Sequence, residues 1–233
     1  GGGTITADTT FQNTGTVQLG DAGTGAPTFS GALDFDSGVS AVTLGGSIVA
    51  NSLELADFGG TTTLAADLTV EVEDTANQVT ARFGPLAGDR TLTVATNGLG
   101  NLDFGDATIG SLVVNQANYL SFYGDFETTG AIDADQNIGG KITMGSAASL
   151  TAGGVLEADA NQGLNLDGSI GGSAVHLGAG GQAITLTGDL AVTSGSGGIH
   201  FGGPVDADDA SAHDRSLTLD AGTGGTVVVS GAV

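Results

Sequence analysis

The sequence predicts an all-β fold, a parallel β-helix (β-solenoid) of roughly ten coils of about 20–25 residues each. Three observations support this prediction. Short apolar-x-apolar triplets recur along the chain, glycine directly follows many of them, and a longer unit returns after about 24 residues. Composition shifts little from residue 1 to residue 233, so we expect one solenoid domain that is a segment of a longer repeat protein.

The triplets have the period of a β-strand. Strict alternation buries one face of a strand and leaves the other polar. Even the best helix candidate, Leu68–Arg82, begins with this alternation, so no helix is predicted. The triplets include Leu33–Phe35, Leu53–Leu55, Leu92–Val94, Leu102–Phe104, Leu112–Val114, Ile142–Met144, Leu164–Leu166, Val175–Leu177, Ile184–Leu186, Leu190–Val192, Ile199–Phe201, Leu217–Leu219 and Val227–Val229.

The longer unit appears three times, as GAIDADQNIGGKITMG from Gly130, GVLEADANQGLNLDG from Gly154 and GPVDADDASAHDRSLTLDAG from Gly203. Each unit reads glycine, apolar, acid, alanine, acid, a polar turn and then a triplet. The first and second units start one period apart, and the second and third start close to two periods apart. We therefore expect two or three short strands per coil and a rod roughly 45–50 Å long at a strand spacing of about 4.8 Å.

Charge and composition exclude several classes of partner. The chain has 26 acidic and 4 basic residues, a formal charge of −22. Nucleic acid needs clustered lysine and arginine, so we expect no binding to it. No stretch of about 18 apolar residues is present, so we expect no insertion into a membrane. The 43 glycines lack the strict third-residue period of collagen, and there is no cysteine for a disulfide.

The glycine-rich stretches GGIHFGGPVDA (197–207) and LTLDAGTGGTVVVSGAV (217–233) resemble the repeats of filamentous-haemagglutinin-like and autotransporter adhesins of bacteria. The resemblance covers essentially the whole chain and rests on the style of the repeat. It implies a right-handed parallel β-helix at an extracellular or bacterial cell-surface location. The secretion-signal domain and membrane anchor of that family are not recognisable, which fits a central stalk segment whose ends meet further coils of the same or an identical chain.

The acidic turns supply candidate calcium ligands. Carboxylates alternate at Asp133 and Asp135, at Glu157 and Asp159, and at Asp206 and Asp208. The EF-hand motif is absent, because these turns lack the glycine that it requires at its sixth position and the glutamate at its twelfth. If Asp133 lies over Glu157 in the next coil, a bridging cation would relieve their repulsion. The alternative is that these carboxylates lie at solvated corners and bind no ion. Calcium is therefore a candidate cofactor, and we expect no cofactor to be required for folding or function.

The segment NYLSFYGDF (118–126) contains both tyrosines of the chain. Alternation predicts that Leu120 and Phe122 point inward and that Tyr119 and Tyr123 point outward. Outward tyrosines suit a platform for stacking a sugar or a lateral contact between rods. Carbohydrate and a host or cell surface are therefore candidate partners.

Histidines and one polar cluster complete the candidate sites. His176 and His200 occupy the central positions of triplets, so we expect them to face outward, where they could share a metal ion only if they are stacked. The cluster SAHDRS (211–216) contains Ser, His and Asp as sequence neighbours. Because a catalytic triad needs partners that converge from separate segments, we interpret it as a polar corner loop.

Three functions fit these patterns. The first is a non-catalytic structural segment of a large extracellular or cell-surface adhesin-like protein. The second is a subunit of a self-assembling extracellular fibre formed by end-to-end strand pairing. The third is a carbohydrate-active β-helix enzyme, which would require a cleft that gathers Lys141 or an arginine with two carboxylates. Only four basic residues are present, so the enzyme ranks last and we expect no catalytic residues.

Overall fold

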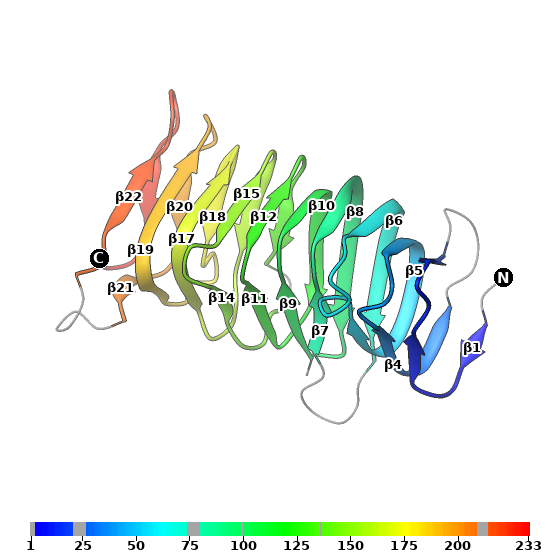
Figure 1. Ribbon diagram of the computed structural model, residues 1–233. Coiled ribbons are helices and arrows are strands. Elements are labelled where there is room, and N and C mark those ends of the chain that lie inside the picture. Colours follow the sequence, from blue (N-terminus) through cyan, green and yellow to red (C-terminus); the bar gives the residue numbers. More distant parts are fainter. Residues whose placement is uncertain (1–2, 21–26, 74–79, 99, 136, 209–213) are drawn as a thin grey trace.

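The computed structural model describes residues 3–20, 27–73, 80–98, 100–135, 137–208 and 214–233. These residues contain 23 β-strands and no helix. The strands pair in parallel into a β-solenoid of about nine turns (Figure 1). The predicted parallel β-helix is confirmed. Within the described ranges, no helix is long and apolar enough to cross a membrane.

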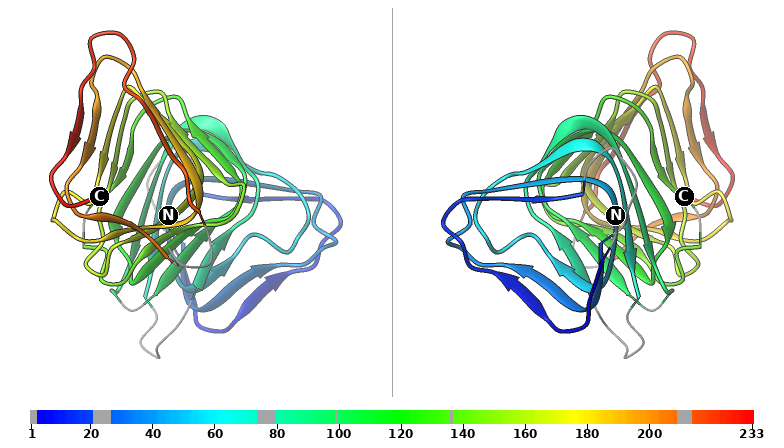
Figure 2. Two further views of the ribbon diagram at one scale, coloured as in Figure 1. Left: turned by 90° about the vertical axis from the view of Figure 1, so that its left-hand side faces the viewer. Right: turned by 90° about the vertical axis from the view of Figure 1, so that its right-hand side faces the viewer.

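The strands form three faces around the solenoid axis, along which Figure 2 looks. Face A contains β3 (Thr16–Leu19), β12 (Asp125–Thr128), β15 (Ser149–Ala152) and β22 (Leu217–Asp220). Face B contains β1 (Thr4–Ile5), β13 (Ile132–Ala134), β16 (Val155–Ala158), β18 (Ala174–Leu177), β20 (Ile199–Phe201) and β23 (Val227–Val229). Face C contains β2 (Thr9–Phe11), β7 (Thr80–Phe83), β9 (Asn101–Phe104), β11 (Tyr119–Phe122), β14 (Ile142–Met144) and β21 (Val205–Ala207).

Seven longer strands bend round a corner and belong to more than one face. They are β4 (Thr28–Phe35), β5 (Ala41–Glu54), β6 (Thr62–Val72), β8 (Leu86–Thr96), β10 (Ala107–Gln116), β17 (Leu164–Gly172) and β19 (Ile184–Ser194). Strand β5 runs through all three faces, as its pairings with β6 and β7 show. The corners are therefore made by bent strands as well as by turns.

The triplets place apolar side chains in columns that run the length of the interior. On face B, Leu92 pairs with Leu112, Leu112 with Ile132, and Ile132 with Leu156. All four side chains are buried. Burial alternates with partial exposure along strands such as β9, β13 and β14, as the two-residue period requires. The core is thus one continuous column of aliphatic and aromatic residues.

Phenylalanines stack across coils on face C. The ring of Phe104 lies 4.8 Å from that of Phe83 and 5.6 Å from that of Phe122 between centroids. Phe126 of face A meets Phe104 edge-on at 5.3 Å. Stacked and edge-on aromatic pairs at these separations add to the free energy of apolar burial. Phe104 is therefore the centre of the aromatic part of the core.

Coil length varies more than the sequence indicates. A short coil leads from Leu102 to its partner Leu120, and a much longer one leads from Ile199 to its partner Val227. Asp133 pairs with Glu157, as the predicted period requires. The predicted alignment of the third acidic turn is wrong, because Asp206 pairs with Thr185 on face C while Glu157 lies on face B. Because the coils differ in length, the third acidic unit lies on face C although its sequence resembles that of the units on face B.

Candidate functional site

A ladder of charged side chains runs along the outer surface of face C. Asp34 pairs with Glu54, Glu54 with Arg82, and Arg82 with Asp103 in successive coils. The guanidinium Nη1 of Arg82 lies 3.9 Å from Glu54 Oε2, and its Nε lies 3.6 Å from Asp103 Oδ2. The Arg82 side chain is 52% exposed, so these ion pairs are loose and individually weak. Arg82 therefore keeps N–H groups for another partner.

Glu54 is the perturbed carboxyl of this ladder. Burial raises the pKa of Glu54, and repulsion from Asp57 and Asp34 raises it further. The backbone N–H of Ala56, which donates to Glu54 Oε1 at 2.9 Å, and the charge of Arg82 act in the opposite direction. Burial has the largest effect, so the protonated form is favoured relative to a free glutamate.

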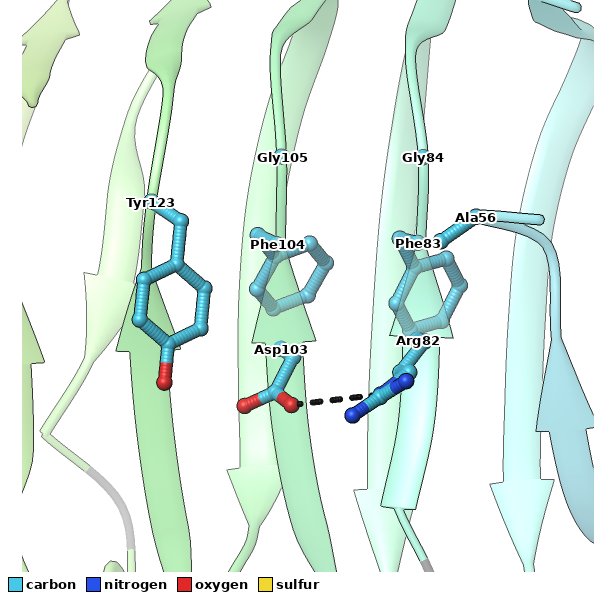
Figure 3. Close-up of a pocket in the computed structure, with 8 residues that line it drawn as sticks. All are labelled: Ala56, Arg82, Phe83, Gly84, Asp103, Phe104, Gly105 and Tyr123. Carbon is cyan, nitrogen blue, oxygen red and sulfur yellow. Dashed lines mark ion pairs between the residues drawn. The ribbon is translucent and has the colours of Figure 1, made fainter. Parts of the chain in front are cut away.

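A shallow groove of about 230 Å³ opens beside Arg82 and Asp103 (Figure 3). Gly84 and Gly105 occupy successive coils just after β7 and β9, where the lack of side chains leaves a trough. A Cβ atom at Gly84 would lie 2.7 Å from the carbonyl oxygen of Leu55, so this position accepts only glycine without movement. Tyr123, in the next coil, forms one wall of the groove.

The structure confirms the predicted direction of the aromatic residues. Leu120 and Phe122 are buried, whereas Tyr119 is 40% and Tyr123 is 61% exposed. Tyr123 lines the groove and Tyr119 does not. Ser121, which shares the outward column of face C with Asp103, is nevertheless buried. The alternation of the strand predicts that the tyrosines point outward. It does not predict the groove, because the groove also requires Gly84 and Gly105, which lie in other coils.

Arg82 between Glu54 and Asp103 is the combination of an arginine with two carboxylates that the enzyme hypothesis requires. Arginine remains protonated in proteins, so Arg82 is a poor base. Its guanidinium also fills the space between the two carboxylates, where a glycosidic bond would have to lie. Lys141 is not part of the groove; its Nζ donates to Asn165 Oδ1 at 3.3 Å.

The six predicted calcium ligands lie in separate places. Asp133 and Glu157 are stacked on face B, whereas Asp206 lies on face C. Asp159 accepts hydrogen bonds from the N–H groups of Ala160 and Gly180, and Asp208 accepts two from Arg215. In the described parts of the chain, no three His, Asp or Glu side chains are grouped to hold a metal ion. Calcium binding at these six carboxylates, Asp133, Asp135, Glu157, Asp159, Asp206 and Asp208, stays a prediction.

Asp133 is strained electrostatically in the folded chain. Burial raises the pKa of Asp133, as do the hydrogen bond and charge of Asp135 and the charge of Glu157. One carboxylate oxygen, Oδ1, is buried without a hydrogen-bond partner. A raised pKa in the folded state means that the folded state binds the proton more tightly than the unfolded state. Stability from this group is therefore greatest in acid and falls as pH rises from about 3.8 through the folded pKa.

We predict that Asp133→Asn stabilises the protein at pH 7 by roughly 0.5–1 kcal/mol, the scale of partly exposed charge interactions. The gain should disappear at pH 3, where the Asp133 carboxyl of the parent is protonated and therefore as uncharged as the amide of the variant. Urea denaturation at the two pH values measures it. Asp206→Asn is the control, because the strand partner of Asp206 among the described residues is the uncharged Thr185. A loss of stability at pH 7 in Asp133→Asn would contradict this account.

The SAHDRS cluster lies partly outside the described residues, since Ser211 and His213 are among 209–213. Of the described part, Arg215 donates to both oxygens of Asp208 at 3.0 and 3.1 Å. The backbone N–H of Ser216 donates to Asp189 Oδ1 at 2.8 Å. The Arg215–Asp208 contact joins the two ends of the loop between β21 and β22, and the Ser216–Asp189 contact ties that loop to the preceding coil.

No protein-family model, curated protein or solved structure matches this chain. The resemblance to filamentous-haemagglutinin-like and autotransporter adhesins therefore stays a prediction based on the repeats.

Proposed function

We propose that this chain is a non-catalytic structural segment of a large extracellular or cell-surface adhesin-like protein. The observation that carries the proposal is the unbroken stack of parallel coils around one apolar core. Such a stack sets a fixed distance along its axis because each coil contacts only its neighbours and adds one strand spacing. Most of the sequence is used to build the stack, which leaves few reactive side chains.

The outer surface supports the adhesin-like part of the proposal. The groove beside Tyr123 offers an exposed aromatic ring together with the Arg82–Asp103 pair. Aromatic rings stack on the apolar faces of sugars, and the ion pair offers both donors and acceptors to hydroxyl groups. The same groove would also accept a side chain from a neighbouring rod. We therefore place lateral or carbohydrate contact at this groove.

A second function, a subunit of a self-assembling fibre, is favoured by the open columns at both ends of the described stack. Val227 continues the inward column of Ile199, yet it is 44% exposed whereas Ile199 is 1% exposed. Ile5 pairs with Phe29, and it is 46% exposed whereas Phe29 is 2% exposed. An uncovered parallel strand with apolar side chains is a template for another strand. Further coils, of the same or an identical chain, would bury both columns.

Negative-stain electron microscopy across a concentration series tests the two functions. Discrete short rods at every concentration are expected for a stalk segment, and long filaments would establish the fibre instead. The variant Val227→Lys should abolish filaments, because it places a charge on the open core column, while its circular dichroism stays unchanged. Side-by-side bundles that persist in Val227→Lys would place the contact at the groove of Tyr123. Compact, non-elongated particles would contradict both functions.

A further inference from the structure

The outer surface of face B brings both described histidines together. In successive coils, Glu157 pairs with His176, and His176 pairs with His200. Neighbouring strands lie about 4.8 Å apart, so the two imidazoles project side by side from adjacent coils. The condition for a shared metal ion, that the histidines are stacked, is therefore met by the register of β18 and β20.

Hydrogen bonds orient both rings. His176 Nδ1 lies 3.1 Å from Glu157 Oε1, and because a carboxylate can only accept, this nitrogen carries the proton. In neutral His176 the lone pair is then on Nε2. A carboxylate that holds the far nitrogen is the usual support of a metal-binding histidine. On His200, Nε2 lies 3.1 Å from Ser230 Oγ, which leaves Nδ1 for a ligand.

The ring separation suits one bridging ion. Zinc binds imidazole nitrogen at about 2.0–2.1 Å, which puts the metal about 3.2 Å from each ring centre and the two centres at most about 6.4 Å apart. The centroids of His176 and His200 are 6.2 Å apart with an interplanar angle of 78°. A tetrahedral angle at the metal requires about 5.2 Å, an approach of about 1 Å. The His176 side chain is 38% exposed, so solvent and a metal ion have access to it.

We propose that His176 and His200 bind one divalent transition-metal ion such as Zn²⁺, with Glu157 as the positioning residue of His176. Water completes the coordination, since the described chain has no third protein ligand in place. Imidazole selects zinc, nickel and copper over calcium, which prefers oxygen. The charge of −22 raises the local concentration of cations. The bound ion would join the coils that contain β18 and β20.

Isothermal titration calorimetry of the full chain with ZnCl₂ in a non-chelating buffer tests the site. We expect one saturable site and an increase in melting temperature with Zn²⁺. His176→Ala and His200→Ala should each weaken binding by at least about tenfold, and Glu157→Gln should weaken it by about 10–100-fold, as loss of an outer partner does. His213→Ala, which changes the remaining histidine, is the matched control and should bind as the parent does.

Three results would overturn the proposal, two from the titrations and one from spectroscopy. One is unchanged Zn²⁺ affinity in the double variant His176→Ala/His200→Ala with parental circular dichroism. Another is displacement of Zn²⁺ by an equal concentration of Ca²⁺, which would assign binding to the carboxylates alone. Electron paramagnetic resonance with Cu²⁺ gives a second readout that does not depend on affinity. Two coupled nitrogens are expected in the parent and fewer in either single variant, and an unchanged spectrum would also contradict the site.

Discussion

Replacing Phe104 by alanine should lower the free energy of unfolding by about 3–5 kcal/mol, the range for removal of a buried phenylalanine. Phe104 is fully buried, and its ring stacks on Phe83 and Phe122 in the coils on either side. Collapse around the cavity is restricted, because the backbone of each coil is hydrogen-bonded to its neighbours. The loss should appear as a decrease in melting temperature of roughly 6–20 °C for a chain of this length.

Tyr123→Ala is the matched control for Phe104→Ala. Its ring adjoins the same coils but is 61% exposed, so its removal should change stability by less than about 0.5 kcal/mol. Urea denaturation of both variants measures the difference. A loss in Phe104→Ala no larger than that in Tyr123→Ala would show that the aromatic stack does not form.

Gly168→Ala should destabilise the chain by roughly 2–5 kcal/mol for two independent reasons. Gly168 has a φ of +85°, which L-residues with a side chain rarely adopt. A Cβ atom there would also overlap the backbone carbonyl oxygen of Ala148 in the preceding coil. That oxygen accepts the N–H of Ser169 at 3.1 Å, so the coil cannot move away without losing a hydrogen bond.

Gly59→Ala separates the two causes. Gly59 has a φ of +78°, but a Cβ atom there would meet nothing within 4 Å. It should therefore show only the conformational cost, about 1–2 kcal/mol. Equal losses in the two variants, measured by thermal denaturation, would mean that the coils are not packed as closely as the structure shows.

The strands and their burial could be predicted from the sequence because they depend on alternation within a few residues. Triplets such as Leu102–Phe104 and Ile142–Met144 are strands with buried ends. The stacking of Asp133 on Glu157 also follows from a local repeat. The position of Asp206 does not, since the coil from Glu157 to its partner His176 is only 19 residues long, so that Asp206 falls past the face-B strand β20 of its own coil.

The site depends on relations between coils that no single segment encodes. The groove requires glycines at 84 and 105 to lie beside Tyr123, and the ladder requires Arg82 to fall between Glu54 and Asp103. Coils of unequal length bring these residues together. The pairing of His176 with His200 also depends on the lengths of the coils between them. From the sequence alone, a shared metal ion could therefore be predicted only on the condition that the two histidines are stacked.

Double electron–electron resonance between spin labels tests the central claim, a rigid rod of stacked coils, most directly. The chain has no cysteine, so two introduced cysteines are the only labelling sites. Thr10, Thr143 and Asp206 lie in one outward column of face C, with Thr143 six and Asp206 nine strand spacings from Thr10.

At about 4.8 Å per strand, labels at Thr10→Cys and Thr143→Cys should be about 29 Å apart, and labels at Thr10→Cys and Asp206→Cys about 43 Å apart. We predict a single narrow distance distribution for each pair and an increase of about 14 Å from the first pair to the second. Broad distributions, or two pairs with the same mean distance, would contradict the stacked solenoid and the structural function proposed for it.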